Sequence, residues 1–330
     1  MRRTVRPGLI LLGALMAALT ILSPPAARAE EAPLESLFWY DPCGGTCAEH
    51  LQAVKRTSNM IMLRERLDEY RQLLGAGFKK AIVGCYGHEG WPKAARIVSE
   101  IKAAGLEVPY LLFADEPDLD EAVDMAWVED LYRRYRTVLD QAGHSEVKLA
   151  PTWSLAGSGV RHWRVLFEWE FVPTFDFIAT TGWYSADSSM IHLVRHRMLE
   201  FLEFLDGRGL DKLEIVPLLK VFSKQGEKQD WEDIYPEWVM RQLRCVTGSG
   251  TSQYSWTNPN TGDVALVTVE PMPEKYLART KAVGFYKMDS RANLDTDKAG
   301  GNSPEIIDSL EGFARERGLT ALGSTAGNSK

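Results

Sequence analysis

The sequence predicts a (β/α)8 barrel, the fold class of TIM barrels, on three observations. Short apolar segments alternate with amphipathic segments along most of the chain. Eight such apolar segments can be counted, which is the strand number of this barrel. Two of them, 178–184 and 215–222, are apolar on both faces, as buried parallel strands are. An open doubly wound sheet is the alternative, but the glycine-rich phosphate loops typical of it are absent from the sequence.

Each expected element has its own local signals. Strands are expected over 37–41, 80–86, 108–114, 147–153, 175–184, 213–222, 251–257 and 282–289. Helices are expected over 60–74, 92–104, 119–142, 190–205, 237–244 and from 303 to about 318. Ser58 or Asn59 is expected to cap the first helix, and Gly105 and Gly143 to follow the ends of later ones. The turn-rich segment 258–272 predicts a β-hairpin above the barrel.

The N-terminal segment has the three parts of a secretory signal peptide. Arg2, Arg3 and Arg6 precede an uncharged apolar run over 9–22, and Ala-Arg-Ala at 27–29 suits signal peptidase. An uncleaved membrane anchor is the alternative, but the run is short for a membrane span. We therefore expect a signal peptide over 1–29, a barrel domain over 30–318 and a disordered tail over 319–330. The mature protein is expected to be secreted or periplasmic.

Composition and charge exclude several classes of protein. The chain has 330 residues, of which 25% are charged and 45% hydrophobic, as in ordinary globular proteins. Its net charge is −7, and cleavage would remove four arginines and no acid, leaving −11. An acidic chain without basic runs is a poor nucleic-acid binder. We expect a monomer without a cofactor and without stable membrane insertion after cleavage.

Four cysteines leave the disulfide pattern open. Export permits disulfides, so Cys43 and Cys47 could pair with each other, or either could pair with Cys85. Cys245 is expected to be a buried free thiol or the odd partner. A zinc site needs four nearby ligands, and this spacing supplies two, so no metal is expected.

The ends of the predicted strands concentrate aromatic and polar side chains. In such a barrel the active site lies at the carboxyl ends of the strands. Aromatic rings pack on the C–H faces of sugars while polar groups bind the hydroxyls, so this collection predicts a carbohydrate ligand. For any single tryptophan, core packing is the alternative. The expected substrate-binding residues are Trp39, Tyr86, Asp115, Trp153, Trp183, Tyr184, Lys220, Trp256 and Lys287.

Glu116 is the candidate catalytic acid. The segment Ala-Asp-Glu-Pro at 114–117 ends an apolar strand with two acids, and proline blocks its continuation. Glycoside hydrolysis needs one carboxylic acid to protonate the leaving oxygen and a second carboxylate as nucleophile or base. Asp289 or Asp41 would be the second, because they end the last and first strands, and Asp289 is preferred. The alternative is that these acids serve a helix N-terminus, which the helix dipole favours.

These motifs resemble secreted bacterial TIM barrels of the glycoside-hydrolase type. The resemblance rests on a strand ending in Asp-Glu-Pro, a long helix, and strands ending in Pro-x-Trp and Trp-Tyr. It implies activity on a polysaccharide, with Glu116 as the acid/base. In the large clan of retaining barrel glycosidases, catalytic glutamates end strands four and seven. Here the strands counted as four and seven end in Trp153 and Trp256 without acids, so the count is off by one, the layout differs, or catalysis is absent.

Two rival functions remain open at this point. A non-catalytic carbohydrate-binding barrel would keep the aromatic residues without a working acid pair. A metal-dependent hydrolase could use His88, Glu89 or the pair His192 and His196, although the polar side of an amphipathic helix predicts a solvated face for that pair. No Gly-x-Ser-x-Gly motif occurs, which argues against a serine hydrolase.

Overall fold

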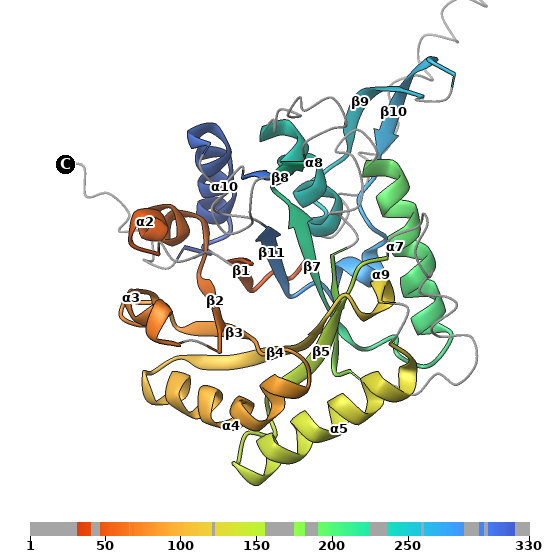
Figure 1. Ribbon diagram of the computed structural model, residues 1–330. Helices are drawn as coiled ribbons and strands as arrows, with labels where there is room; N and C mark the ends of the chain where they lie inside the picture. Colours follow the sequence, from red (N-terminus) through yellow and green to blue (C-terminus); the bar gives the residue numbers. More distant parts are fainter. Residues whose placement is uncertain are drawn as a thin grey trace, which may run out of the picture.

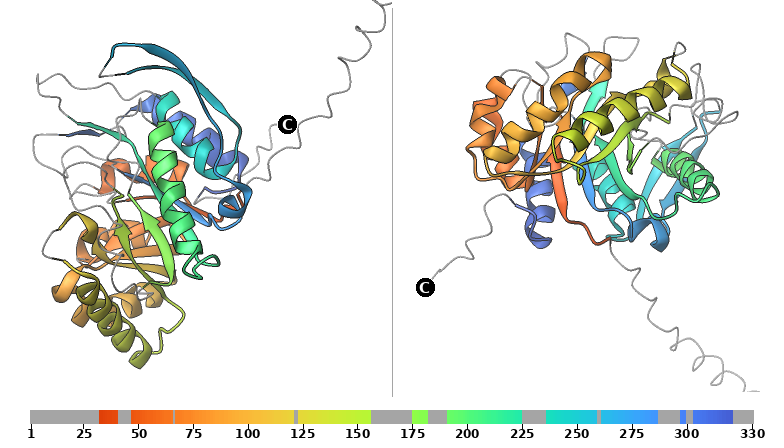
Figure 2. Two further views of the ribbon diagram at one scale, coloured as in Figure 1. Left: turned by 90° about the vertical axis from the view of Figure 1, so that its right-hand side faces the viewer. Right: turned by 90° about the horizontal axis from the view of Figure 1, so that it is seen from below.

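Eight parallel strands form the barrel that the sequence predicts. In the computed structural model, the described residues are 32–40, 47–65, 67–120, 123–155, 175–181, 191–224, 236–258, 261–286, 297–299 and 303–320. The strands pair in the order β1-β11-β7-β6-β5-β4-β3-β2, with every pair in this sheet parallel. Helices cover the outside of this sheet, as Figures 1 and 2 show. The predicted fold class is therefore confirmed.

The elements have the following bounds. The barrel strands are β1 (Ser36–Trp39), β2 (Met60–Arg64), β3 (Lys80–Gly84), β4 (Glu107–Asp115), β5 (Lys148–Trp153), β6 (Phe177–Thr180), β7 (Glu214–Lys220) and β11 (Ala282–Tyr286). The helices are α2 (Cys47–Thr57), α3 (Arg71–Leu74), α4 (Gly87–Ala103), α5 (Met125–Gln141), α7 (Ile191–Asp206), α8 (Pro236–Thr247), α9 (Glu274–Leu277) and α10 (Pro304–Glu316), with short 3-10 helices η1 (Leu67–Tyr70) and η2 (Pro117–Leu119). Two small antiparallel sheets pair β9 (Ser252–Thr257) with β10 (Val264–Val269), and β8 (Phe222–Lys224) with β12 (Asp297–Ala299).

The side chain of Asn59 joins the two ends of the sheet. Its Oδ1 accepts the backbone N–H of Leu37 at 2.9 Å, and its Nδ2 donates to the carbonyl of Glu35 at 2.9 Å. Its own backbone N–H donates to the carbonyl of Leu37 at 3.2 Å. One asparagine therefore supplies the hydrogen bonds between β1 and the start of β2, and the sheet closes into a barrel.

The interior of the barrel is filled by side chains, as in other barrels of this size. Phe38 and Leu218 are completely buried. Gly284 makes room for both, because a Cβ there would lie 2.3 Å from Leu218 Cδ2 and 2.6 Å from Phe38 Cζ. The barrel is thus a packed core, and any substrate must bind at one of its ends.

The segment 60–74, predicted as a helix, instead begins with strand β2. Its first residues, Met-Ile-Met-Leu, are all buried, so they form a continuous apolar run that suits a strand buried on both faces. Asn59, predicted as the helix cap, closes the barrel instead. Helical structure in this segment is confined to η1 and α3.

The segment 251–257, predicted as the seventh barrel strand, lies in a hairpin outside the barrel. β9 pairs with β10 in a continuous antiparallel register, which confirms the hairpin but moves its first strand. The alternating buried and exposed residues of β9 are typical of a strand with one solvated face.

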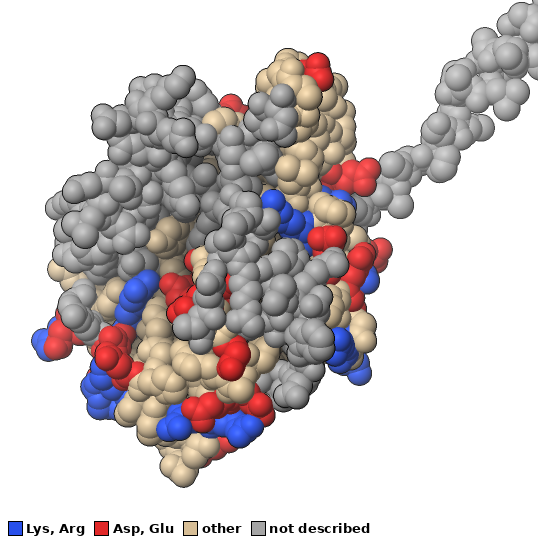
Figure 3. Space-filling view, turned by 45° about the vertical axis from the view of Figure 1, so that its right-hand side comes forward, with Lys and Arg blue, Asp and Glu red and all other residues tan. Residues whose placement is uncertain are grey.

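Val264 and Leu266 on β10 are each 70% exposed. Figure 3 shows this hairpin as a protruding lobe with few charges, whereas charged side chains gather over the lower part of the molecule.

The thiols of Cys85 and Cys245 are free and buried. Cys85 Sγ lies 3.2 Å from the carbonyl of Gly90, so the expected alternative of a Cys85 disulfide with Cys43 or Cys47 is wrong. Burial raises the pKa of the Cys85 thiol to about 11 and that of the Cys245 thiol to about 12. Cys43 and the side chain of Cys47 lie outside the described part of the chain.

Among the described residues, no helix is long and apolar enough to span a membrane.

We expect Asn59→Ala to lower the free energy of unfolding by about 2 kcal/mol, because it leaves the buried Leu37 N–H without its partner. Asn59→Asp keeps the acceptor for Leu37 but sets a carboxylate oxygen against the carbonyl oxygen of Glu35, so it should also destabilise the protein. Gln253→Ala, on the exposed face of β9, serves as the control and should change stability by less than about 0.5 kcal/mol. Urea unfolding measures all three. Equal stability of wild type and Asn59→Ala would show that closure does not depend on this side chain.

Candidate functional site

Two tyrosines and a carboxylate meet at the carboxyl ends of three strands. Tyr40 follows β1, Tyr86 follows β3, and Asp115 ends β4. The Tyr40 hydroxyl donates to Asp115 Oδ1 at 3.0 Å and lies 2.6 Å from the Tyr86 hydroxyl. Tyr40 is only 2% exposed, whereas Tyr86 is half-buried and Asp115 is exposed. Tyr40 therefore forms part of the floor of the barrel mouth, and Asp115 faces solvent above it.

Arg64 places a positive charge beside both tyrosine rings. It is the last residue of β2, and its Cζ lies 5.8 Å from the ring centroid of Tyr40 and 5.4 Å from that of Tyr86. A guanidinium at this distance from an aromatic face is attracted by the ring. The ring of Tyr286, at the end of β11, packs on Tyr40 with 5.4 Å between centroids. The floor of the mouth is thus aromatic, with one cation against it.

Glu116 adopts a left-handed backbone conformation, with φ 47° and ψ 53°. For a residue other than glycine this conformation costs about 1–3 kcal/mol, and such residues concentrate at functional sites. Two acceptors hold the turn, because the Glu116 N–H points at both the carbonyl oxygen of Thr152 (3.0 Å) and its Oγ1 (3.1 Å). The Thr152 hydroxyl also donates to Asp115 Oδ1 at 2.8 Å. A single threonine on β5 therefore positions both acids.

The side chain of Glu116 turns toward the end of β6. The hydroxyl of Thr181, the residue after β6, donates to Glu116 Oε1. Thr181 is buried and Glu116 is half-buried. Asp115 and Glu116 are consecutive in sequence, yet their carboxyl groups have separate hydrogen-bond donors.

Asp118 fixes the loop that follows these acids. Its carboxylate accepts the backbone N–H groups of Ser154 at 2.9 Å and Leu155 at 3.0 Å. Burial raises the pKa of Asp118 above its usual value, since its side chain is almost inaccessible, and the two backbone hydrogen bonds act in the opposite direction. Leu155 is also in the left-handed region, at φ 55°. Asp118 thus joins the loop after β4, which contains Glu116, to the loop after β5.

Three tryptophans predicted to bind substrate lie in the core or on the hairpin. Trp39 and Trp153 are completely buried, and the Trp39 indole N–H donates to Thr57 Oγ1 at 2.8 Å. Both therefore have the position of core side chains, the alternative considered for any single tryptophan. Trp256 lies on the hairpin strand β9, where its ring packs edge-on against His192 at 5.2 Å between centroids. None of the three presents a ring at the floor of the mouth.

Other predicted site residues lie outside the described part of the chain. These are Asp41, Trp183, Tyr184, Lys287 and Asp289, together with the side chain of Lys220. Their predicted roles stay predictions.

The residues of the metal-hydrolase alternative are dispersed. His88 and Glu89 are exposed in the first turn of α4, and His88 packs against Trp127. His192 is half-buried beneath the hairpin, with its Nδ1 at 2.7 Å from the Tyr254 hydroxyl, rather than on a solvated face. His196 is exposed near Glu200. Among the described residues, no group of three or more His, Cys, Asp or Glu side chains could hold a metal ion.

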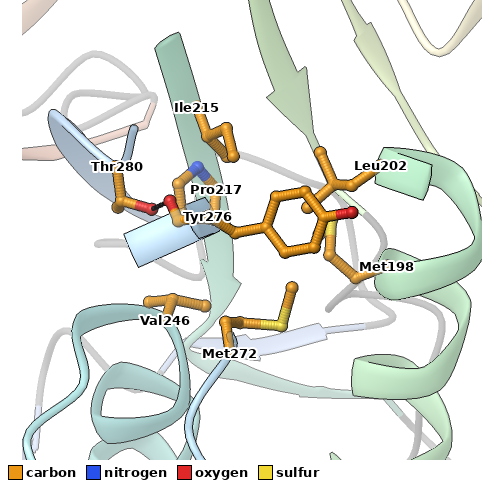
Figure 4. A pocket seen from close by; sticks show the side chains of 8 residues that line it. All are labelled: Met198, Leu202, Ile215, Pro217, Val246, Met272, Tyr276 and Thr280. Carbon is orange, nitrogen blue, oxygen red and sulfur yellow. Dashed lines mark hydrogen bonds between the residues drawn. The ribbon is translucent and has the colours of Figure 1, made fainter. Parts of the chain in front are cut away.

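Two hollows of the molecule lie away from the mouth. One is a cavity of about 10 Å³, lined by apolar side chains of α7, β7, α8 and α9 and shown in Figure 4. That volume suits about one water molecule and no sugar. The other is an open groove of about 590 Å³ between α8 and α10, lined by Arg244, Asp308 and Arg317 among others. Neither includes Asp115 or Glu116.

The strand count corrects the position of the Asp-Glu-Pro segment. Because β2 was predicted as a helix, the sequence count placed this segment at the end of strand three. It ends β4, the fourth barrel strand in chain order. The seventh barrel strand is β7, which ends at Lys220 and has no acid at that position.

Several residues of the site had no predicted role. Thr152 and Thr181 stand at predicted strand ends, but their link to the two acids depends on side-chain geometry that a sequence pattern does not contain. Arg64 was missed because the strand it ends was predicted as a helix. Its signal was an apolar run closed by one charged residue, which is the pattern of other strand ends in this chain.

No protein-family model and no curated protein matches the chain. Among solved structures, it is similar to the β-glucuronidase of Ruminococcus gnavus, with a TM-score of 0.48, 8% identity, and 86% of this chain and 50% of that chain covered. The chain thus spans half the length of that enzyme. The GH18 chitinase ChiB of Flavobacterium johnsoniae has a TM-score of 0.41 and 8% identity, over 86% of this chain and 95% of that one. A plant β-glucan endohydrolase has a TM-score of 0.27 and 12% identity, over 57% and 56%.

We expect Glu116→Gly to be more stable than Glu116→Ala by about 1 kcal/mol, because only glycine adopts the left-handed conformation without steric cost. Thermal or urea unfolding measures the difference. The control is the same pair of substitutions at Glu129, within α5, where alanine should be the more stable by about 1 kcal/mol. If Glu116→Ala were the more stable variant, the left-handed turn would not be a feature of the folded protein.

Proposed function

We propose that this protein is an exported glycoside hydrolase that acts on a polysaccharide or oligosaccharide, with Glu116 as the catalytic acid. The observation that carries the proposal is the position of Glu116. It directly follows the fourth barrel strand in a strained left-handed turn. The oxygens of Thr152 accept its backbone N–H, and the Thr181 hydroxyl donates to its carboxyl group. The resemblance to barrel glycosidases implies a catalytic glutamate at the end of that strand.

The surroundings of Glu116 suit the protonation of a leaving oxygen. A catalytic acid must be held within hydrogen-bond reach of the glycosidic oxygen. The turn at Glu116 is fixed twice from the side of β5, by Thr152 on that strand and by Asp118 through the loop after it. Half-burial of Glu116 limits the water that competes for its proton. These features support the acid role.

The second carboxylate is a separate part of the proposal. At the end of the seventh strand, where the resemblance implies a second glutamate, the chain has Lys220. The sequence offers Asp289 and Asp41, which follow β11 and β1, neighbours in the closed barrel. Either could face Glu116 across the mouth, provided that the two carboxyl groups lie about 5–9.5 Å apart.

We expect Glu116→Gln to reduce hydrolysis of any active polysaccharide or oligosaccharide by at least about 10²-fold, because glutamine cannot donate the proton to the leaving oxygen. A panel of polysaccharides, with reducing ends measured, provides the assay. Glu89→Gln is the matched control: it removes an exposed glutamate in the first turn of α4, after β3, and should retain wild-type activity. Equal activity of Glu116→Gln and wild type would remove Glu116 from the mechanism, and sugar binding without any hydrolysis by wild type would favour a carbohydrate-binding barrel.

Export is tested by the mass of the mature protein. Expression in a bacterial host with a secretory pathway should release a chain that begins at Glu30, because signal peptidase cleaves after the small-x-small site. Ala29→Leu should block cleavage at that site and leave the full-length chain in the membrane fraction. Recovery of full-length wild-type protein in the cytoplasm would contradict export.

A further inference from the structure

We propose that β10 binds an extended segment of another polypeptide, which adds a third strand to the β9–β10 hairpin and carries a Lys or Arg at each end. This interaction goes beyond the proposed hydrolase function and does not depend on it. The hairpin stands out from the barrel, as Figures 1 and 3 show. In the described part of the chain, β10 pairs with β9 alone, so no strand lies along its other edge.

The backbone of β10 presents N–H and C=O groups at this edge. The N–H of Asn258 donates to the carbonyl of Asp263 at 2.8 Å, as in a hydrogen-bonded pair of an antiparallel ladder. Such pairs alternate with non-hydrogen-bonded pairs, so Val264, Leu266 and Thr268 belong to the second kind. Their N–H and C=O groups therefore point away from β9, and an added strand would pair with them.

Two of the same residues present apolar side chains to solvent. Val264 and Leu266 are the most exposed large apolar side chains among the described residues. Their partners on β9 are Thr257 and Ser255, which are exposed and polar. A strand added to β10 would cover apolar surface with its alternate side chains, whereas a strand added to β9 would meet hydroxyl groups. The side chains therefore favour β10 as the docking edge.

The strand β10 lacks the features that normally prevent such pairing. Exposed edge strands are blocked by a charge, a proline, a bulge or a very short length. β10 has six residues, none of them charged and none of them proline. Its pairing with β9 runs through all six without a shift in register. An edge of this kind suits a strand whose role is to bind another strand.

The opposite face of the hairpin is packed on the helices of the barrel. The Tyr254 hydroxyl lies 2.7 Å from His192 Nδ1 on α7, and Arg241 on α8 lies 5.0 Å from the centroid of the Tyr254 ring. Trp256 packs on the same histidine, and Val269 at the end of β10 is buried. The edge is therefore ordered before a partner binds, which lowers the entropic cost of binding.

Two exposed acids define the chemistry of the partner. Asp263 precedes β10 and Glu270 follows it, and neither forms an ion pair with a described side chain. Seven steps of extended chain, at about 3.3 Å each, separate the two residues by about 23 Å. A partner strand of eight residues would place its two end residues beside these acids. A Lys or Arg at each end is the pattern that complements them.

The same acids argue against two other occupants. If two copies of β10 paired antiparallel about their centres, Asp263 of one copy would lie beside Glu270 of the other, and like charges across a strand pair are destabilising. A membrane surface rich in anionic lipids would repel both carboxylates. A strand with basic ends gains an attraction that neither of these occupants has.

The probe is the blocked octapeptide acetyl-Lys-Thr-Thr-Thr-Val-Thr-Val-Lys-amide. In the antiparallel register its lysines would lie beside Glu270 and Asp263, and its valines beside Leu266 and Val264. The peptide is titrated into the ¹⁵N-labelled protein, and the amide signals are followed by NMR. Binding should saturate, with a dissociation constant below about 1 mM.

Hydrogen exchange shows whether the peptide adds as a strand. At a peptide concentration tenfold above the dissociation constant, exchange of the Val264, Leu266 and Thr268 amides should slow about tenfold, because about nine-tenths of the protein is then bound. The amides of Ala265 and Val267 point toward β9, so they are protected in the free protein and should change little. Peptide that only covered side chains would not produce this alternation.

Leu266→Pro should abolish peptide binding, because proline has no N–H for an added strand. Ser255→Pro is the matched control: Ser255 is the partner of Leu266 in the hairpin, and its N–H points to the β9 edge, so binding should persist. Leu266→Lys keeps the backbone of β10 and should weaken binding at least about tenfold, because a charge on the edge opposes pairing. This variant keeps the test decisive if proline disturbs the hairpin.

The acids are tested separately from the edge. Asp263→Asn and Glu270→Gln should each weaken binding of the lysine peptide by about threefold, as for exposed ion pairs. A peptide with glutamate in place of both lysines should bind wild type more weakly than the lysine peptide. The glutamate peptide should bind the double variant better than wild type.

Four results would overturn the proposal. The first is the absence of saturable binding of the lysine peptide to wild type. The second is protection that persists in Leu266→Pro and disappears in Ser255→Pro, which would place the added strand on β9. The third is equal affinity for the lysine and glutamate peptides, which would remove the basic ends. The fourth is a wild-type dimer in sedimentation that Leu266→Pro abolishes, which would assign the edge to a second copy of the chain.

Discussion

Closure of the barrel between β1 and β2 is the constraint on which the rest of the site depends. The contacts of Tyr40 with Arg64, Tyr86 and Asp115 connect β1 to the next three strands in chain order. If the sheet were open at this seam, β1 and β2 would be its two edges, at opposite ends of eight strands. Asn59 joins these two edges. Its carboxamide bonds to the backbone of Leu37 and Glu35, in place of the hydrogen bonds that a longer pair of strands would form. The aromatic floor of the mouth exists because these ends meet.

Strain at Glu116 is the second physical feature that organises the site. The left-handed turn costs about 1–3 kcal/mol and persists only where surrounding contacts determine it. Here those contacts come from β5, through Thr152, and from Asp118, whose buried carboxylate is itself costly unless hydrogen-bonded. A chain selected for stability alone would place glycine at such a turn. The presence of glutamate argues that its side chain has a role at this position.

The sequence predicted the architecture better than it predicted the order of the strands. Continuous apolar segments such as β4 and β7 are unambiguous, because their length and flanking residues exclude a helix. Met60–Arg64 is too short for that distinction, and its apolar residues also fit one face of a helix, so β2 was missed. The sequence predicts a barrel strand over 251–257, although the alternating buried and exposed residues of β9 are typical of a hairpin with one solvated face. The two errors cancelled in the total of eight and displaced the Asp-Glu-Pro segment by one strand.

The same limit applies to the site. Glu116, Asp115 and Tyr86 could be found from the sequence because they stand directly after apolar strands. The burial of Trp39 and Trp153 could not, because strand-end position does not distinguish a ring that faces the mouth from one that faces the surrounding helices. Thr152 and Thr181 could not be assigned, because their function depends on which oxygen each hydroxyl reaches. These are relations between strands, and no local pattern encodes them.

Consecutive acids can hold different roles only if the backbone directs them apart. In a regular strand, neighbouring side chains point to opposite faces, so one of the two acids would be buried in or behind the barrel. The left-handed turn at Glu116, the residue after β4, breaks this alternation. Asp115 then meets Tyr40 and Thr152, while Glu116 meets Thr181, so both carboxyl groups remain at the mouth with separate donors. The strain at one residue thereby gives two consecutive carboxyl groups different surroundings at the mouth of the barrel.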